Sequence, residues 1–173
     1  LKKYSEVIVM HSEMAKFHSV DPFDVCRFAA ALEALGEREK AKTALNDSLK
    51  STPGHFEALN FRAYFYIQDG NLGEAALDLR RSIQSNREFA VAYNNLAGIF
   101  LQHSDAKSAL PNLVLSMKFE AENPALHRNW SIYHELLGSQ TEATASLETA
   151  RLLGLDRTEY EVLLTKIRKE NQT

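Results

Sequence analysis

The sequence repeats with a period of 34 residues from Pro22 to Arg157, without an insertion or a deletion. In all four copies position 20 is alanine and position 24 is leucine, while positions 8 and 27 always hold Ala or Ser. Such a period predicts small units that stack on one another, because one unit alone cannot cover its apolar face. The copies span residues 22–55, 56–89, 90–123 and 124–157.

Each copy predicts a pair of helices. Apolar residues at positions 4, 7 and 11, such as Val25, Phe28 and Leu32, share one helix face. A Gly or Ser at position 15 then ends the helix in the left-handed conformation. A second apolar stripe at positions 17, 20, 24 and 28 predicts an antiparallel partner, and small residues at positions 8 and 20 let the two backbones approach. Only seven Gly and four Pro in 173 residues agree with an all-α chain that has short connections.

This pattern resembles the tetratricopeptide repeat, whose signature has large, small, aromatic and alanine positions in the same places. The third copy fits best, through Tyr93, Leu96, Ala97, Phe100, Ala109 and Leu113. The resemblance implies an all-α superhelix, a solenoid of four helix-turn-helix repeats with flanking N- and C-terminal helices. Four residues depart from the signature, and we expect them to alter local packing only; they are Arg62, Ser104, His127 and His134.

One of these departures places a charge at an apolar position. Arg62 occupies position 7 of the second copy, where a packed side chain is expected. A long side chain often buries its stem and still reaches solvent or a carboxylate. We therefore expect an ion pair to satisfy the guanidinium, with Asp69, Glu74 or Asp78 as its partner. The alternative is that the charge marks a ligand contact.

Local signals set the ends of the repeat region. Asp21 and Asn123 each precede a proline at a repeat start, which is typical of an N-cap followed by the first helical residue. Asp156 is expected to cap a last helix in a capping box with Glu159, so residues 158–173 form a C-terminal capping helix. Residues 1–21 are expected to form an N-terminal helix, either a cap or the second helix of a truncated repeat.

Composition and motifs exclude several classes of function. A net charge of -3 leaves no basic excess for a nucleic-acid backbone, and no apolar run of 18 residues predicts membrane insertion. The sequence has no phosphate-binding loop, nucleophile elbow or zinc-protease motif. The pairs His11/His18 and His127/His134 lack a third ligand between them, so we expect packed histidines and no metal. We therefore predict no enzyme, no cofactor and no metal.

Asparagine marks the predicted binding face. The first helix of each repeat is expected to line a concave groove, with positions 2, 5, 6, 9, 12 and 13 not used for packing. Asn60, Asn94, Asn95 and Asn129 occupy positions 5 and 6, although asparagine disfavours a helix interior. A carboxamide can pair with a peptide unit of an extended ligand, as in the asparagine ladder of some tetratricopeptide superhelices. The alternative is that these side chains join one repeat to the next or face water.

Aromatic and basic neighbours complete the predicted peptide-binding site. Phe61 and Tyr64 are expected beside Gly98, whose missing side chain leaves an apolar pocket for one ligand residue. Arg27 and Arg128 at the two ends would favour an acidic ligand. Basic residues of the family's two-carboxylate clamp are absent, because Asn60, Ala125 and Asn129 stand in their places. The complete set is Arg27, Asn60, Phe61, Tyr64, Asn94, Asn95, Gly98, Gln102, Arg128 and Asn129.

The sequence thus favours a non-enzymatic adaptor that binds a protein or peptide segment in its groove and helps to assemble a complex. The alternative is a regulatory or substrate-presenting region of a larger enzyme whose catalytic part lies outside this chain. A third prediction is self-association through the N-terminal helix, by an apolar stripe of Val7, Met10 and Met14. The sequence does not identify the partner or the compartment; the cytoplasm is favoured, and the periplasm is the alternative if a signal has been removed.

Overall fold

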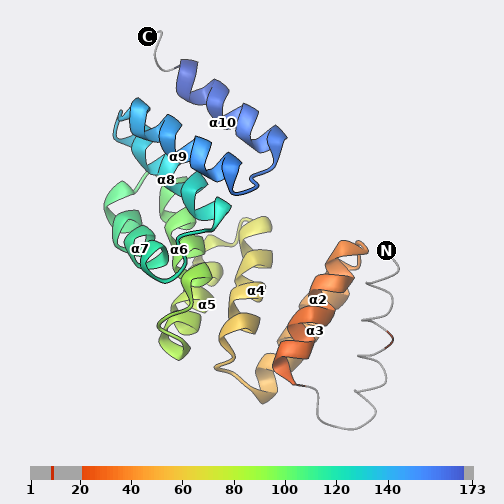
Figure 1. The fold of residues 1–173 in the computed structure, drawn as a ribbon. Helices are drawn as coiled ribbons and strands as arrows, with labels where there is room; N and C mark the ends of the chain where they lie inside the picture. Colours follow the sequence, from red (N-terminus) through yellow and green to blue (C-terminus); the bar gives the residue numbers. More distant parts are fainter. Residues whose placement is uncertain (1–8, 10–20, 170–173) are drawn as a thin grey trace. The chain divides into compact units, whose positions relative to one another are not determined.

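The computed structural model describes Val9 and residues 21–169, and within residues 21–169 all regular secondary structure is helical (Figure 1). The predicted N-terminal helix, its apolar stripe and the pair His11/His18 lie outside the described residues. The helices are α2 (Pro22–Ala34), α3 (Arg38–Ser51), α4 (Phe56–Gln68), α5 (Leu72–Ser85), α6 (Ala90–Gln102), α7 (Ala106–Phe119), α8 (Pro124–Leu136), α9 (Gln140–Leu152) and α10 (Arg157–Lys169).

Helix starts follow the period of the sequence. The helices α2, α4, α6 and α8 begin at the first position of the four copies, and α3, α5, α7 and α9 all begin at position 17. Two of the predicted N-caps are confirmed, since Asp21 Oδ1 accepts from the Phe23 N–H at 2.8 Å and Asn123 Oδ1 from the Ala125 N–H at 3.0 Å. Local side-chain chemistry therefore fixes where these helices begin.

The N-terminus of the last helix is capped by the side chain of Asp156 alone, without the reciprocal bond of a capping box. Asp156 Oδ1 accepts from the Thr158 N–H at 2.8 Å and the Glu159 N–H at 3.1 Å, as expected. The predicted capping box is wrong in its second half, because the Glu159 carboxylate instead accepts from Arg128 Nη1 at 2.9 Å. A guanidinium carries a full positive charge that a backbone N–H lacks, so Glu159 turns toward Arg128 on α8.

The turn inside each helix pair is left-handed, as position 15 predicts. Gly36, Gly70 and Gly138 have φ between 71° and 80°, and Ser104 adopts φ 56° at the equivalent position. The Asp105 N–H donates to the Phe100 carbonyl at 2.9 Å across the serine, which closes the same Schellman-type turn that glycine closes elsewhere. Serine has a steric cost there that glycine does not.

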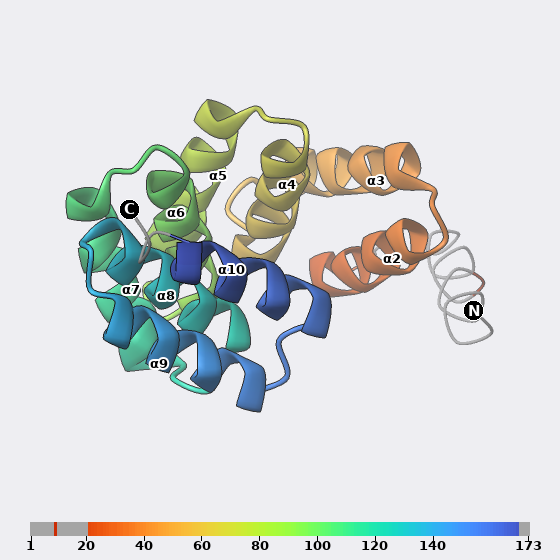
Figure 2. The same ribbon diagram turned by 90° about the horizontal axis from the view of Figure 1, so that it is seen from above.

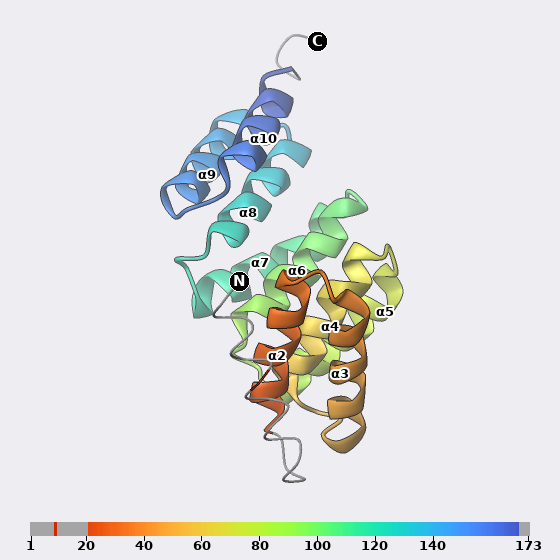
Figure 3. The same cartoon turned by 90° about the vertical axis from the view of Figure 1, so that its right-hand side faces the viewer.

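The chain forms two compact units, residues 1–87 and 88–173. Unit 1 contains the helices of the first two copies, and unit 2 those of the last two copies. In unit 1, α2 pairs with α3 and α4 with α5, and Figure 3 shows α2, α3 and α4 side by side. Their shared core holds Ala29 and Ala41 at the close approach and Leu45 and Leu59 around it, all 1% exposed or less. Alanine at these positions lets the backbones meet, as the small-residue columns predict.

Unit 2 pairs α6 with α7 and α8 with α9, and α10 packs on α9 (Figure 2). The inner face of α10 is apolar, and its residues Leu164 and Ile167 are buried against Ala143 and Leu147 of α9. Among the described residues no helix is both long enough and apolar enough to cross a membrane.

Candidate functional site

A pocket in unit 2 brings together side chains from α6, α8 and α10. We call it the groove pocket; its volume is about 350 Å³. It is lined by Gly98, Leu101, Gln102, Ser104, Arg128, Asn129, Ile132, Leu136 and Lys166. Four of the residues predicted from the sequence are among them, namely Gly98, Gln102, Arg128 and Asn129. Neighbouring first helices of successive repeats therefore present one hollow with both apolar and polar walls.

Gly98 leaves room on the α6 side of this pocket. A Cβ built at Gly98 would meet only one atom within 4 Å, the side-chain nitrogen of Asn129 at 3.5 Å. This is an ordinary contact, so glycine is not required by crowding. Its backbone is helical, and glycine disfavours a helix interior. The missing side chain therefore leaves the pocket open beside Gly98, where Ile132 and Leu136 of α8 form an apolar wall.

Asn94 and Asn129 form hydrogen bonds to each other inside unit 2. Asn94 is 3% exposed and Asn129 is 1% exposed. The Asn129 amide donates to Asn94 Oδ1 at 2.9 Å and to the Asn94 carbonyl at 3.1 Å, while its own oxygen accepts from Arg128 Nη2 at 3.0 Å. This arrangement favours the alternative that asparagine joins one repeat to the next. A role of these two side chains as peptide ligands stays a prediction.

The two cations of the groove pocket are paired with carboxylates. Arg128 Nη1 donates to Glu159 of α10 at 2.9 Å, and Lys166 Nζ lies 2.7 Å from Glu135 Oε1. The Glu135 side chain is 4% exposed, so Lys166 compensates a buried charge. Glu159 is 41% exposed and forms a weaker rim pair. The charges of these two cations are thus nearly cancelled by their partners.

The predicted residues of unit 1 form a separate group on α2 and α4. Arg27 pairs with Asp24 on its own helix, and Asn60 is half-buried. The Phe61 ring stacks on Phe65 at 5.3 Å between centroids and packs against the core, while Tyr64 remains 37% exposed. The predicted pocket of Phe61, Tyr64 and Gly98 joins residues of both units and stays a prediction.

Groups capable of acid–base or metal chemistry are scattered. Within residues 21–169 no three His, Cys, Asp or Glu side chains converge as metal ligands. Burial, with Glu57 and Asp21 nearby, raises the pKa of Cys26 to about 12, so its thiol stays protonated at neutral pH. His127 Nε2 lies 2.8 Å from the Ala121 carbonyl, and the His134 ring stacks on Trp130 at 5.6 Å. Both histidines are packed or hydrogen-bonded, as expected.

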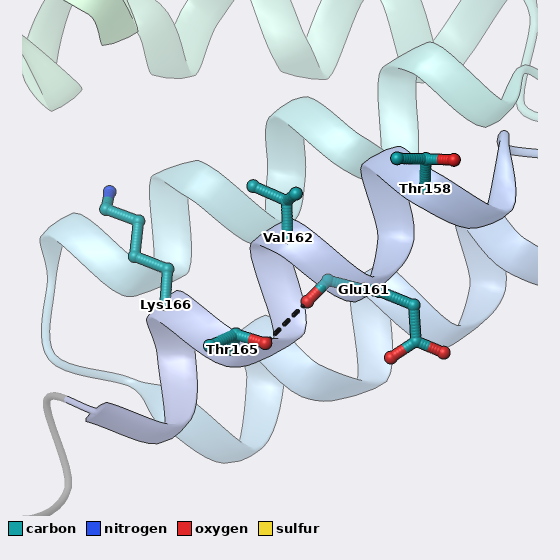
Figure 4. A pocket seen from close by; sticks show the side chains of 5 residues that line it. All are labelled: Thr158, Glu161, Val162, Thr165 and Lys166. Carbon is teal, nitrogen blue, oxygen red and sulfur yellow. Dashed lines mark hydrogen bonds between the residues drawn. The ribbon is translucent and has the colours of Figure 1, made fainter.

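A second hollow follows one face of α10 alone (Figure 4). Thr158, Val162 and Lys166 extend to one side of the helix there, and Thr165 Oγ1 donates to the Glu161 carbonyl at 2.8 Å. All of its lining residues belong to a single helix. Because binding pockets gather groups from several elements, the groove pocket is the stronger candidate.

Sequence reasoning missed five residues of the groove pocket. Leu101, Ile132 and Leu136 stand at positions 12, 9 and 13 of their copies, which were expected not to be used for packing. That expectation is wrong for two of them, because Leu101 is buried in the core of unit 2 and Ile132 packs against the same cluster. Ser104 is the left-handed turn residue. Lys166 lies beyond the fourth copy, so no repeat position could place it, and only the packing of α10 brings it to the pocket.

No protein-family model matches the sequence, and no curated protein matches it. Solved structures do match. A thermophilic tetratricopeptide repeat protein from Thermus thermophilus is 22% identical with a TM-score of 0.74, over 87% of this chain and 82% of the other. A tetratricopeptide repeat protein from Parabacteroides merdae is 21% identical with a TM-score of 0.73, over 99% of this chain and 67% of the other.

The chain has the tetratricopeptide repeat fold. The predicted all-α repeat architecture is thereby confirmed. A third similar structure is the first tetratricopeptide repeat domain of Spaghetti (RPAP3), solved with the HSP90 peptide SRMEEVD. It is 16% identical with a TM-score of 0.60, over 69% of this chain and 94% of that domain. At these identities the tetratricopeptide repeat likeness concerns the fold alone.

Proposed function

We propose that this chain is a protein-interaction module that holds a peptide or protein segment against α6 and α8, the first helices of its third and fourth copies. The observation that carries the proposal is the groove pocket, where Gly98, Gln102 and Arg128, chosen from the sequence, converge from α6 and α8. The peptide-bound Spaghetti domain supports the same mode of use for this fold. The function is assembly of a complex rather than chemistry on a substrate.

One ligand side chain would anchor the segment. An aliphatic or aromatic residue enters the space above Gly98 and packs on Ile132 and Leu136. Full burial of such a side chain contributes about 1.5–3 kcal/mol, enough to act as a hot spot. Gln102 is exposed at the rim, and its carboxamide can both donate to and accept from the ligand backbone.

Charge would tune this affinity rather than supply it. An acidic ligand group beside the anchor has to replace Glu159 on Arg128. Since an exposed pair of this kind contributes at most about 1 kcal/mol, little free energy is lost in the exchange. Glu135 is different, because its buried carboxylate needs Lys166. The ligand is therefore expected to compete for Arg128 and to leave Lys166 in place.

A substitution at Gly98 tests the proposal. Short peptides are selected by display on the wild-type chain, and their affinity is then measured for Gly98→Leu and for Gly73→Leu. Gly73 is an exposed glycine in α5 with nothing within 4 Å of a built Cβ, so it matches the chemical change outside the groove pocket. We expect Gly98→Leu to weaken binding at least about tenfold by filling the anchor space. Equal affinities of the two variants would contradict the proposal.

A further inference from the structure

We propose that unit 1 carries a second site, which binds a phosphorylated side chain of a protein partner. We call it the cationic hollow; its volume is about 420 Å³. It is lined by Asn46, Leu49, Lys50, Pro53, Arg62 and Arg81, from α3, the turn after it, α4 and α5. Three of these residues are cations and none is a carboxylate. The proposal is independent of the groove pocket, which lies in the other unit.

Arg62 is the fixed element of this hollow. It stands at position 7 of its copy, where the other copies hold Phe28, Leu96 and Trp130. Its Nε and Nη2 donate to the two oxygens of Asp78 at 2.7 and 2.8 Å, which confirms one of the three expected ion pairs. The side chain of Asp78 is 4% exposed and that of Arg62 is 20% exposed. A bidentate pair of this kind holds the guanidinium plane in one orientation.

The Arg62 guanidinium retains donors for a ligand. Asn46 Oδ1 accepts from its Nη1 at 3.1 Å, so the bonds to Asp78 and Asn46 use three of its five N–H groups. One face of the group lies over the Tyr66 ring at 5.8 Å. The hollow therefore has a preorganised donor at its wall, so a ligand loses less free energy in ordering this side chain than it would with a free arginine.

Lys50 and Arg81 supply movable charge around this fixed group. Lys50 Nζ pairs with Asp47 at 2.8 Å, but the two side chains are 77% and 62% exposed. An exposed pair is weak, so Lys50 can exchange Asp47 for a stronger anion. Arg81 is exposed and pairs with no carboxylate within residues 21–169. With Asp78 compensating Arg62, the hollow keeps an excess positive charge that the groove pocket lacks.

A phosphoryl group suits this arrangement. It carries nearly two negative charges and three acceptor oxygens, which match two guanidinium groups and an ammonium. Leu49 and Pro53 add apolar wall, and the volume far exceeds the room that a free phosphate ion needs. That combination favours a phosphate attached to a side chain. A nucleic-acid backbone would need a longer basic track than three residues on a chain of net charge -3.

The test uses the full chain and four probes. Backbone amide shifts are followed by ¹H–¹⁵N NMR while a blocked Leu-phosphoserine-Leu tripeptide, its serine form, inorganic phosphate or an oligothymidylate is added. We expect the phosphopeptide to shift amides of α3 and α5 near Asn46 and Arg81 in a saturable way. The serine form should cause no such shifts, and inorganic phosphate should bind at least about fivefold more weakly, since it has no contact with Leu49 and Pro53.

Neighbouring arginines on α5 provide the matched variants. Arg80 and Arg81 are both exposed, and only Arg81 lines the hollow. We expect Arg81→Gln to weaken phosphopeptide binding about fivefold or more, because Arg81 lines the hollow. Arg80→Gln should change the affinity less than about twofold, and it is a matched control because it changes the net charge by the same amount. Equal losses in the two variants would overturn the proposal. So would binding of the serine form, or of inorganic phosphate or the oligothymidylate, as tightly as the phosphopeptide.

Discussion

Two arginines from the first helices of the second and fourth copies meet carboxylates in different ways. Arg62 pairs with Asp78 inside its own repeat, and the Asp78 side chain is 4% exposed. Arg128 pairs with Glu159 of the capping helix, whose side chain is 41% exposed. The first pair is part of the packed interior of unit 1, whereas the second closes the rim of the groove pocket. The same residue type thus forms a pair with a buried carboxylate in one unit and with an exposed carboxylate in the other.

The difference follows from desolvation. Removing one partner of a buried ion pair leaves an uncompensated charge in a poorly hydrated place, which destabilises the fold strongly. Removing one partner of an exposed pair leaves a charge that water solvates. We therefore expect matched deletions to destabilise the fold strongly at the buried pair and only slightly at the exposed pair.

Deleting the buried carboxylate should give the largest loss of stability. We expect Asp78→Ala to lower the free energy of unfolding by about 3 kcal/mol, at the lower end for buried pairs because Arg62 is partly exposed. Glu159→Ala, the matched deletion at the rim, should cost about 0.5 kcal/mol or less. Urea denaturation of both variants measures the contrast. Similar losses would show that the two pairs do not differ in the way proposed.

The buried amide pair of unit 2 should give the next largest effect. Asn129→Ala leaves Asn94 without its partner, so we expect a loss of about 2 kcal/mol in the free energy of unfolding. Gln102→Ala, at the exposed rim of the same pocket, should change stability by less than about 0.5 kcal/mol. Denaturation monitored by circular dichroism distinguishes them. If Asn129→Ala left the stability unchanged, the bond to Asn94 would not be structural, and a role of Asn129 in ligand binding would be favoured instead.

The N-caps of α4 and α8 contrast a titratable with a non-titratable side chain. His55 Nδ1 accepts from the Ala58 N–H at 3.2 Å, whereas Asn123 caps α8 through its amide oxygen. Burial lowers the pKa of His55, although Glu57 and Asp21 act the other way. The unfolded chain therefore takes up this proton at a higher pH than the folded chain does. His55 destabilises the fold as the pH falls from about 6.5 toward the lowered pKa.

The measurement for His55 is the free energy of unfolding as a function of pH. We expect the wild type to lose stability between about pH 7 and pH 5 more steeply than His55→Asn, because asparagine caps without titrating. Equal slopes would mean that the His55 cap is not sensitive to protonation in this range.

The smallest expected effect concerns the left-handed turn of unit 2. Ser104 adopts φ 56° where unit 1 has Gly70 at φ 76°. Ser104→Gly should raise the free energy of unfolding by about 0.5 kcal/mol, the steric relief being partly offset by chain entropy. Gly70→Ser should lower it by about 1 kcal/mol. Thermal denaturation of the two variants checks the opposite signs, and a loss in both would contradict this explanation.

Backbone features of this chain could be predicted from the sequence because they depend on neighbours along the chain. The N-caps at Asp21 and Asn123 and the left-handed Ser104 are examples. Side-chain partners between elements could not be predicted in the same way. Glu159 turning from its own helix to Arg128 depends on where α10 packs. That packing also determines the place of Lys166 in the groove pocket.

The inward position of Asn129 shows the same limit at the candidate site. Its repeat position predicts the groove face, and the residue does border the groove pocket, but its amide bonds to Asn94. Whether a polar side chain at such a position points to a ligand or to the next repeat depends on the local spacing of two helices. Gly98 and Gln102 line the groove pocket as their repeat positions predict, while their roles in ligand binding stay predictions.

Amide NMR mapping of a display-selected peptide on the full chain tests the central claim most directly. We expect the largest shifts on α6 and α8, around Gly98, Gln102 and Ile132, and we expect them to saturate with the same affinity as the binding isotherm. Gly98→Leu should abolish these shifts, and Gly73→Leu should not. Shifts confined to α7 and α9, or shifts that survive in Gly98→Leu, would contradict the claim that the groove pocket holds the ligand.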